Sequence, residues 1–153
     1  MKRIYIVLLI FLFAYTDIVY SKQEEKTVPV VVEADKLIFR KKENIARYIG
    51  NVVIKRGDIK IKSEELLIFF GEKNKIKKII AKGGVFFQKG LDIKGKAQEA
   101  ILENNKLILK GNAQIQQKNN LLEGDIIIID LKTGSVEVKG KKGRVRTIIF
   151  PED

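Results

Sequence analysis

Apolar and polar residues alternate along most of the chain from residue 28 onward, a pattern that is typical of half-buried β-strands. Residues 59–62 and 107–110 show this period of two, and Val, Ile and Phe, which favour strands, dominate the patterned segments. Turn-forming residues interrupt the alternation at 57–58, 71–74, 90–92, 104–105, 118–120 and 133–134. The pattern predicts an all-β fold of short antiparallel strands in a meander, without an internal domain boundary.

Two short motifs recur with a period of about thirty residues, which indicates one structural unit stacked on copies of itself. The first motif is Gly50-Asn51-Val52, and it returns at 83–85 and 111–113. The second motif, which first reads Glu33-Ala34-Asp35-Lys36-Leu37, contains an acidic residue that is Asp35, Glu64 or Asp125 in three of its copies. Its third copy, at 95–100, lacks both this acid and the leucine. We expect these acids to serve turns or strand edges rather than metal binding or acid–base chemistry.

Superposing the repeats predicts one continuous inner face, since alternate residues of a strand share a face. A pair of glycines at 83–84 predicts a β-bulge, which leaves open whether Phe86 or Phe87 points inward. Apolar residues on such a face form a core by default. The predicted inner residues are Val30, Val32, Leu37, Phe39, Val52, Ile54, Ile59, Ile61, Leu66, Ile68, Val85, Phe87, Leu109, Ala113, Ile115, Ile127 and Ile129.

The first residues have the layout of a secretory signal peptide. Lys2 and Arg3 precede an apolar run at 4–15, and Val19 and Ser21 are small residues before a potential cleavage site. The run is shorter than the ~20 residues that a membrane-spanning helix needs. We expect residues 1–21 to be removed and residues 22–153 to form a single domain, while an uncleaved membrane anchor is the alternative.

The composition excludes several kinds of chemistry. The chain has no Cys and no His, so it lacks thiolate zinc ligands, disulfides and the commonest general base. Neither a Ser-His nor a Cys-His pair can be assembled. The sequence therefore predicts a protein that is not an enzyme and that has no cofactor and no metal site.

The net charge of +11 indicates an anionic partner such as a phosphorylated lipid, an acidic polysaccharide or a nucleic acid. A lysine-rich surface that only maintains solubility is the alternative. Binding of single-stranded nucleic acid favours exposed aromatic residues beside basic groups. The chain has no Trp, and Phe39, Phe69, Phe70, Phe86 and Phe87 lie in apolar runs, so we expect no nucleic-acid partner.

Four segments in order resemble the OstA-like family of lipopolysaccharide-transport proteins. Residues 50–61 followed by Leu66 resemble the family's first block, and residues 111–117 with 123–125 resemble its second. Residues 29–35 resemble its first strand, and Gly143-Arg144-Val145 with residues 149–151 resemble its last strand. The resemblance covers nearly all of residues 22–153, and it is closest to the periplasmic bridge member of the family.

This resemblance implies an open, twisted β-jellyroll of antiparallel strands whose apolar groove holds the acyl chains of lipid A, the membrane anchor of lipopolysaccharide. The inner residues named above would line this groove, with Arg47, Lys55 and Arg56 as rim candidates. Family members join end to end, so the edge residues Val28, Val30, Val145 and Ile149 are candidates for head-to-tail self-association.

The implied location is the periplasm. The implied partners are an inner-membrane component similar to LptC and an outer-membrane component similar to LptD. The alternatives are a membrane-anchored, LptC-like component of the same fold and a purely structural β-repeat module.

Overall fold

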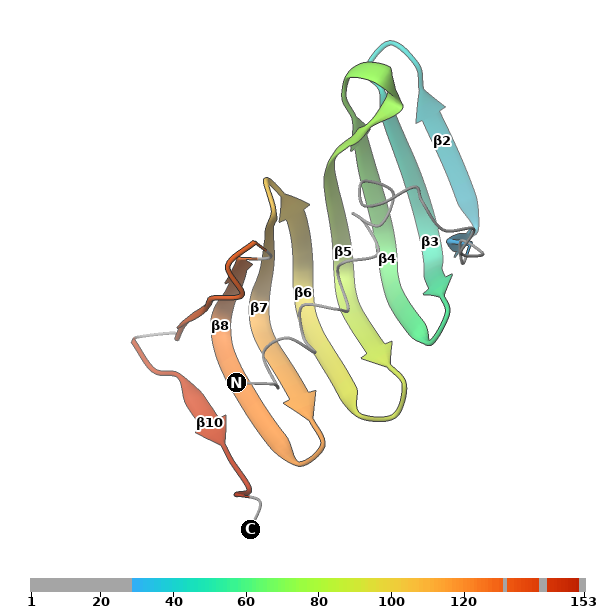
Figure 1. Cartoon of the computed structure of the whole chain (residues 1–153). Coiled ribbons are helices and arrows are strands. Elements are labelled where there is room, and N and C mark those ends of the chain that lie inside the picture. The colour runs from blue at the N-terminus through green and yellow to red at the C-terminus, as the bar shows by residue number, and fades with distance from the viewer. Residues whose placement is uncertain (1–28, 131, 141–142, 152–153) are drawn as a thin grey trace, which may run out of the picture.

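The computed structural model describes residues 29–130, 132–140 and 143–151, which form one antiparallel β-sheet (Figure 1). A single 3₁₀ turn, Glu72–Asn74, interrupts the described strands. The strands are β1 (Val31–Glu33), β2 (Lys36–Arg40), β3 (Ile45–Arg56), β4 (Ile59–Phe70), β5 (Ile76–Lys89), β6 (Ile93–Glu103), β7 (Lys106–Gln117), β8 (Asn120–Asp130), β9 (Val136–Lys139) and β10 (Arg146–Ile148).

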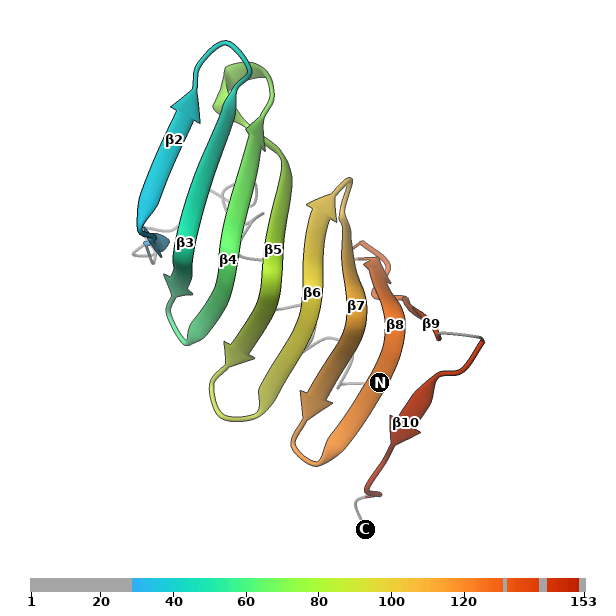
Figure 2. The same cartoon turned by 180° about the vertical axis from the view of Figure 1, so that it is seen from behind.

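Strands β3 to β8 follow one another as hairpins, and each pairs with the next in this order. β1 and β2 both pair with β3 at one edge, and β9 and β10 both pair with β8 at the other. Figures 1 and 2 show the two edges far apart, so the sheet is twisted and does not close. The predicted all-β, open, repeat-built fold is confirmed, and the turns from β3 to β9 lie at the predicted turn signals. The turn at 41–44 between β2 and β3 was not predicted.

The strands are longer than the sequence pattern predicted. β3 to β8 have 11 to 14 residues each, about twice the usual strand length. The prediction of short strands was wrong because β3, β5 and β7 each continue through a bulge at the centre, and β4, β6 and β8 continue alongside them. In a sequence, the glycine of such a bulge resembles the end of a strand.

The bulges form a line across the sheet. The strand register shifts between Ile49 and Val52 in β3, between Lys82 and Val85 in β5, and between Lys110 and Ala113 in β7. Residues at these bulges have positive φ angles, such as 83° at Gly50 and 48° at Asn51, which Gly and Asn adopt more readily than other residues. The line divides the sheet into two halves, and it explains the recurring Gly-Asn motif.

The second recurring motif lies directly opposite the first. A Cβ atom on Gly50 would lie 2.6 Å from Oδ2 of Asp35, and one on Gly83 would lie 2.7 Å from Cβ of Glu64. In the third repeat, a Cβ on Gly111 would lie 2.6 Å from Oε1 of Gln98. Each bulge glycine therefore leaves space for the acid or amide opposite it. Asp35 lies between β1 and β2, whereas Glu64 lies in the middle of β4, so the predicted place at turns or strand edges does not describe Glu64.

The two halves of the sheet share one hydrophobic core. Val52, Ile115 and Phe87 come from one side of the bulge line, whereas Leu66, Leu109 and Ile127 come from the other, and all six belong to a single buried cluster. Phe87 is 3% exposed and Phe86 is 58% exposed, so it is Phe87 that points inward. The inner face of each half packs toward the other, as in an open jellyroll.

The predicted signal peptide and Val28 lie outside the described residues. Within the part of the chain that the structure describes, we find no helix with the length and hydropathy needed to cross a membrane.

Candidate lipid-binding groove

An apolar cavity of about 310 Å³ lies between the two halves of the sheet, on the side of β1 to β7. At one end of the cavity, Val30 precedes the edge strand β1 and Val32 belongs to it. At the other end, Leu107 of β7 lines the cavity. All the lining side chains are aliphatic or aromatic. They are Val30, Val32, Ile54, Ile61, Leu66, Ile68, Ile76, Ile79, Ala81, Val85, Phe87, Ala100, Leu102 and Leu107.

Eight residues that the sequence predicted for the groove line this cavity. They are Val30, Val32, Ile54, Ile61, Leu66, Ile68, Val85 and Phe87. The other lining residues, Ile76, Ile79, Ala81, Ala100, Leu102 and Leu107, were not among the predicted groove residues. Five of these six lie on β5, β6 and β7, and the superposition of the repeats already places them on the predicted inner face, although they were not named as groove residues. Ile76 follows an irregular turn.

Six predicted groove residues are buried in packed core and do not line the cavity. Val52, Leu109, Ala113, Ile115, Ile127 and Ile129 are buried, and Val136 and Val138 of β9 pack against the same cluster. Ile59, at the start of β4, is half-buried against that cluster and does not line the cavity. The inner face is therefore hollow toward β1 and filled toward β9.

The open end of the groove exposes apolar side chains at the β1–β2 edge. Leu37 is 55% exposed and Phe39 is 56% exposed, although both pair with inner-face positions of β3. Their exposure follows from their place on an edge strand, where no further described strand covers them. The ring of Phe39 meets that of Phe70 edge-on, with 6.3 Å between the ring centres.

The cavity coincides with small residues in the middle of the sheet. On one inner row, Leu66, Ala81, Ala100, Leu109 and Ile127 are neighbours on successive strands. β4 and β8 supply Leu66 and Ile127 at this position, whereas β5 and β6 supply alanines. The hollow therefore arises where the third repeat departs from the others, which is the departure visible in the sequence.

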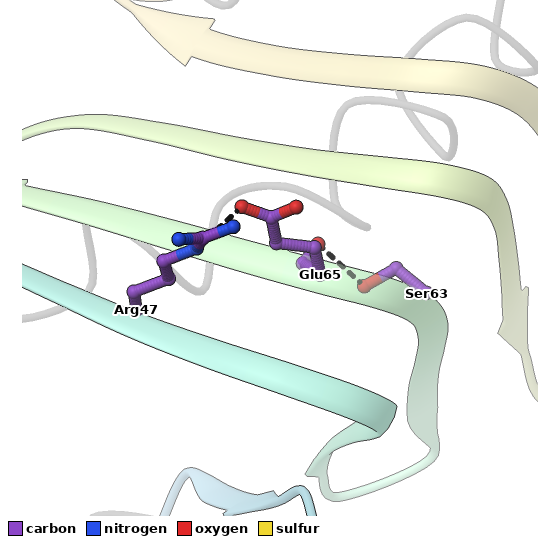
Figure 3. Close-up of polar contacts among 3 residues, drawn as sticks. All are labelled: Arg47, Ser63 and Glu65. Atoms are coloured by element: carbon purple, nitrogen blue, oxygen red, sulfur yellow. Dashed lines mark hydrogen bonds and ion pairs between the residues drawn. The ribbon is translucent and has the colours of Figure 1, made fainter. Parts of the chain in front are cut away.

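The three rim candidates lie in different places. Arg47 pairs with Glu65 on the outer face of the sheet, where its Nε donates to Oε1 at 2.8 Å (Figure 3). Lys55 is exposed and alternates with the inward Ile54, so it also lies on the outer face. Arg56 shares the inner face with Ile54 and ends β3 opposite Ile59, which places it at the rim of the groove.

The predicted edge residues lie at the two open sides of the sheet. Val30 precedes β1 and is exposed, and Val145 and Ile149 flank β10 and are exposed. The backbone N–H of Phe150 donates to Oδ1 of Asn120 at 2.8 Å, which holds the segment after β10 beside β8. The structure thus leaves one edge formed by β1 and β2 and another formed by β9 and β10.

Polar groups contribute little to the groove itself. Ser63 is buried beside the bulge of β3, where it pairs with Val52, and its Oγ donates to the backbone carbonyl of Glu65 at 3.1 Å (Figure 3). Hydrogen bonds from the backbone N–H groups of Thr133 and Lys132 lower the pKa of Asp130, far from the cavity in the β8–β9 turn. Among the described residues, no cluster of His, Cys, Asp or Glu is suited to hold a metal ion.

Comparisons with known proteins agree with this geometry. The chain is 28% identical to the lipopolysaccharide export system protein LptA of Escherichia coli K12, over 80% of this chain and 71% of that protein. It is also 28% identical to LptA of Haemophilus influenzae, over 86% of this chain and 83% of that protein. The crystal structure of LptH, the LptA-homologous periplasmic component of the lipopolysaccharide transport device of Pseudomonas aeruginosa, has the same fold. Its TM-score is 0.69 at 19% identity, and the match covers 84% of this chain and all of that one.

A family model described as LptA/(LptD N-terminal domain) LPS transport protein matches residues 31–135, which include most of the sheet and the whole cavity-lining set except Val30. The chain therefore belongs to the LptA/LptD N-terminal domain family of lipopolysaccharide transport proteins.

Proposed function

We propose that this protein carries lipopolysaccharide through the periplasm by holding its lipid A acyl chains in the groove between the two half-sheets. The observation that supports this most directly is the cavity of about 310 Å³ with an entirely apolar lining. A soluble domain usually fills such a space with side chains. The chain belongs to a lipopolysaccharide-transport family, and the acyl chains of lipopolysaccharide are apolar like the lining of the cavity.

The energetics favour the acyl chains over the head group as the source of affinity. Each buried methylene contributes about 0.8 kcal/mol, so ten methylenes contribute roughly 8 kcal/mol before the entropic costs of binding. An exposed pair between a basic side chain and a phosphate contributes about 1 kcal/mol or less. Arg56 at the rim would assist capture of the phosphorylated head group without determining the affinity.

We further propose that copies of the protein associate head to tail. Both ends of the sheet present unpaired strand edges, which soluble proteins usually protect or use for assembly. The apolar residues Val30 and Leu37 at one edge and Val145 and Ile149 at the other are exposed in the single chain. Strand pairing between β10 of one copy and the β1–β2 edge of the next would cover them and extend the groove. Components similar to LptC and LptD would occupy the two ends of such a bridge.

Photo-crosslinking tests the lipid-binding proposal. A photoreactive residue at Ile54, which lines the cavity, is expected to crosslink to lipopolysaccharide, and a residue at the adjacent Lys55, on the outer face, is not. Ile115 is buried in packed core beyond the cavity, so a probe there is expected to crosslink more weakly than one at Ile54. Equal labelling at Ile54 and Lys55, or none at Ile54 in folded protein, would contradict the proposal.

The periplasmic location rests on the predicted signal peptide. We expect N-terminal sequencing of the protein purified from cells to identify Lys22 as its first residue. Retention of residues 4–20 would instead indicate the membrane-anchored relative of the same fold. In either form the protein would act by binding and transfer rather than by catalysis.

A further inference from the structure

A second row of inner-face residues crosses the other half of the sheet and contains one gap. The residues that pair across successive strands from β3 to β8 are Ile54, Ile61, Phe87, Gly95, Ile115 and Leu122. Gly95 is the only position in this row without a side chain. It lies directly opposite Phe87, the largest member of the row and a residue of the cavity wall.

The ring of Phe87 occupies the space above Gly95. A Cβ atom built on Gly95 would lie 1.9 Å from Cζ, 2.1 Å from Cε1 and 2.7 Å from Cε2 of this ring. Real Cβ atoms do not approach other heavy atoms so closely, so the ring can hold this position only because residue 95 is glycine. The conformation of Gly95 does not demand glycine, since it is absent from the positive-φ residues of the chain.

The position of this ring bears on the size of the cavity, because Phe87 is one of the lining residues. Phe87 is fixed at its backbone by pairing with Ile61 on one side and Gly95 on the other. A side chain at residue 95 would displace the ring, and the adjacent unfilled space is the cavity that the ring already borders. On the opposite wall, Ala100 stands where the neighbouring repeats have Leu66 and Ile127, so its small size adds to the same hollow.

We propose that Gly95, through Phe87, and Ala100 set the acyl-chain length that the groove accepts. This inference rests on the proposed lipid-binding function and adds a specificity-determining pair of positions to it. An apolar cavity of about 150 Å³ holds one benzene molecule. The cavity here is about twice as large, so it accommodates roughly twelve carbons of a chain.

The expected signature is a break in the dependence of affinity on chain length. Each methylene that enters the cavity raises the affinity about fourfold. Beyond about twelve carbons, further methylenes remain partly in water and add less. A phenyl ring that moves into the cavity would fill about half of it, and the break would shift to about six to eight carbons.

The experiment measures binding of saturated lysophosphatidic acids of eight to sixteen carbons by isothermal titration calorimetry, below their micelle concentrations. The Gly95→Ala variant is expected to bind the twelve-carbon lipid at least tenfold more weakly than the wild type, with little change for the eight-carbon lipid. Ala100→Leu is expected to act in the same direction without a change at residue 95 or 87. Phe87→Leu in the Gly95→Ala background is expected to restore the longer break.

The matched control is Phe86→Leu, which changes the neighbouring outward ring and should leave the profile unchanged. Wild-type protein that binds none of these lipids would overturn the proposed function itself. A wild type that binds with a clear length dependence, while Gly95→Ala and Ala100→Leu keep its break and affinity, would overturn only the chain-length inference. Circular dichroism establishes folding, and if Gly95→Ala does not fold, Ala100→Leu and the Phe87→Leu/Gly95→Ala double variant decide the outcome.

Discussion

The adjacent glycines of the β5 bulge allow backbone strain to be separated from side-chain crowding. Gly83 and Gly84 have nearly the same φ, 82° and 79°, so alanine is strained at both positions. A Cβ on Gly83 would lie 2.7 Å from Cβ of Glu64 and 3.2 Å from its Cγ, whereas a Cβ on Gly84 meets no atom within 4 Å. The two alanine variants therefore differ in one contact.

The expected losses follow from these two terms. Left-handed backbone costs a residue with a side chain about 1–2 kcal/mol, so Gly84→Ala should lower the free energy of unfolding by about that amount. Gly83→Ala adds a contact with a Cβ atom that cannot rotate away, and overpacking of this kind costs about 1–3 kcal/mol more. For a domain of this size, each kcal/mol lowers the melting temperature by about 4 °C.

Urea unfolding followed by circular dichroism gives both free energies, and a double-mutant cycle identifies the contact. Glu64→Gly removes the Cβ that the new methyl group of Gly83→Ala would meet, so the two changes should couple by about 1–3 kcal/mol. Glu64→Ala keeps that Cβ and serves as the matched control. Equal losses for Gly83→Ala and Gly84→Ala, or no coupling with Glu64→Gly, would refute the account of the bulge line.

The remaining predictions concern the bulge, a turn, the outer face and the sheet edge. Gly84→Asn should be at least about 1 kcal/mol more stable than Gly84→Ala in the same urea titration, because Asn tolerates positive φ and stands at this bulge position in β3 and β7; equal stability of the two variants would contradict this. The lowered pKa of Asp130 stabilises the fold at pH values above the ordinary aspartate pKa of about 3.9, and this contribution should be lost as the pH falls through the pKa of the folded state. The free energies of unfolding of the wild type and of Asp130→Asn, measured against pH, should therefore converge at low pH. Curves that stay parallel throughout would contradict this. Arg47→Ala should lower the free energy of unfolding by less than about 1 kcal/mol, since the pair with Glu65 is partly exposed. It should also leave lipopolysaccharide binding within about twofold of the wild type. A larger loss of binding would indicate that Arg47 contacts the lipid, as a rim residue would. Ile149→Lys should abolish concentration-dependent association in sedimentation velocity while preserving the melting temperature, because a charged edge opposes strand pairing; a wild type that stays monomeric at all concentrations would argue against head-to-tail assembly.

The sequence predicts the fold well because the repeats share the same alternation of inward and outward residues. The turn at Asn104-Asn105, for example, separates two strands whose period-two patterns agree with their observed pairing. The bulge line was predicted only at Gly83-Gly84, where two glycines are adjacent. At Gly50 and Gly111 the following Asn hides the bulge, because Gly-Asn is equally typical of a turn.

The candidate site was less predictable than the fold. Alternation assigns a residue to the inner face, but it does not say whether that face is filled or hollow at that point. Ile54 and Ile115 occupy equivalent positions in their repeats, yet Ile54 lines the cavity and Ile115 lies in packed core. The difference depends on side chains from strands on the other half of the sheet, which no local pattern contains.

Repetition and departure from repetition have separate physical roles in this chain. Where β8 supplies Ile127, the opposing inner faces fill the space between them, and a chain built only from such repeats would close into an ordinary core. β6 instead supplies Ala100, which pairs with its neighbours like the larger residues of the row but has a smaller side chain and lines the cavity. The backbone therefore keeps the stability of a regular sheet, while the small side chain of Ala100 leaves space that forms part of the groove. On this account, restoring the repeat at Ala100 by leucine should stabilise the protein toward urea and weaken lipid binding together, whereas a change that lowered both would show that the hollow is not a departure from an otherwise well-packed core.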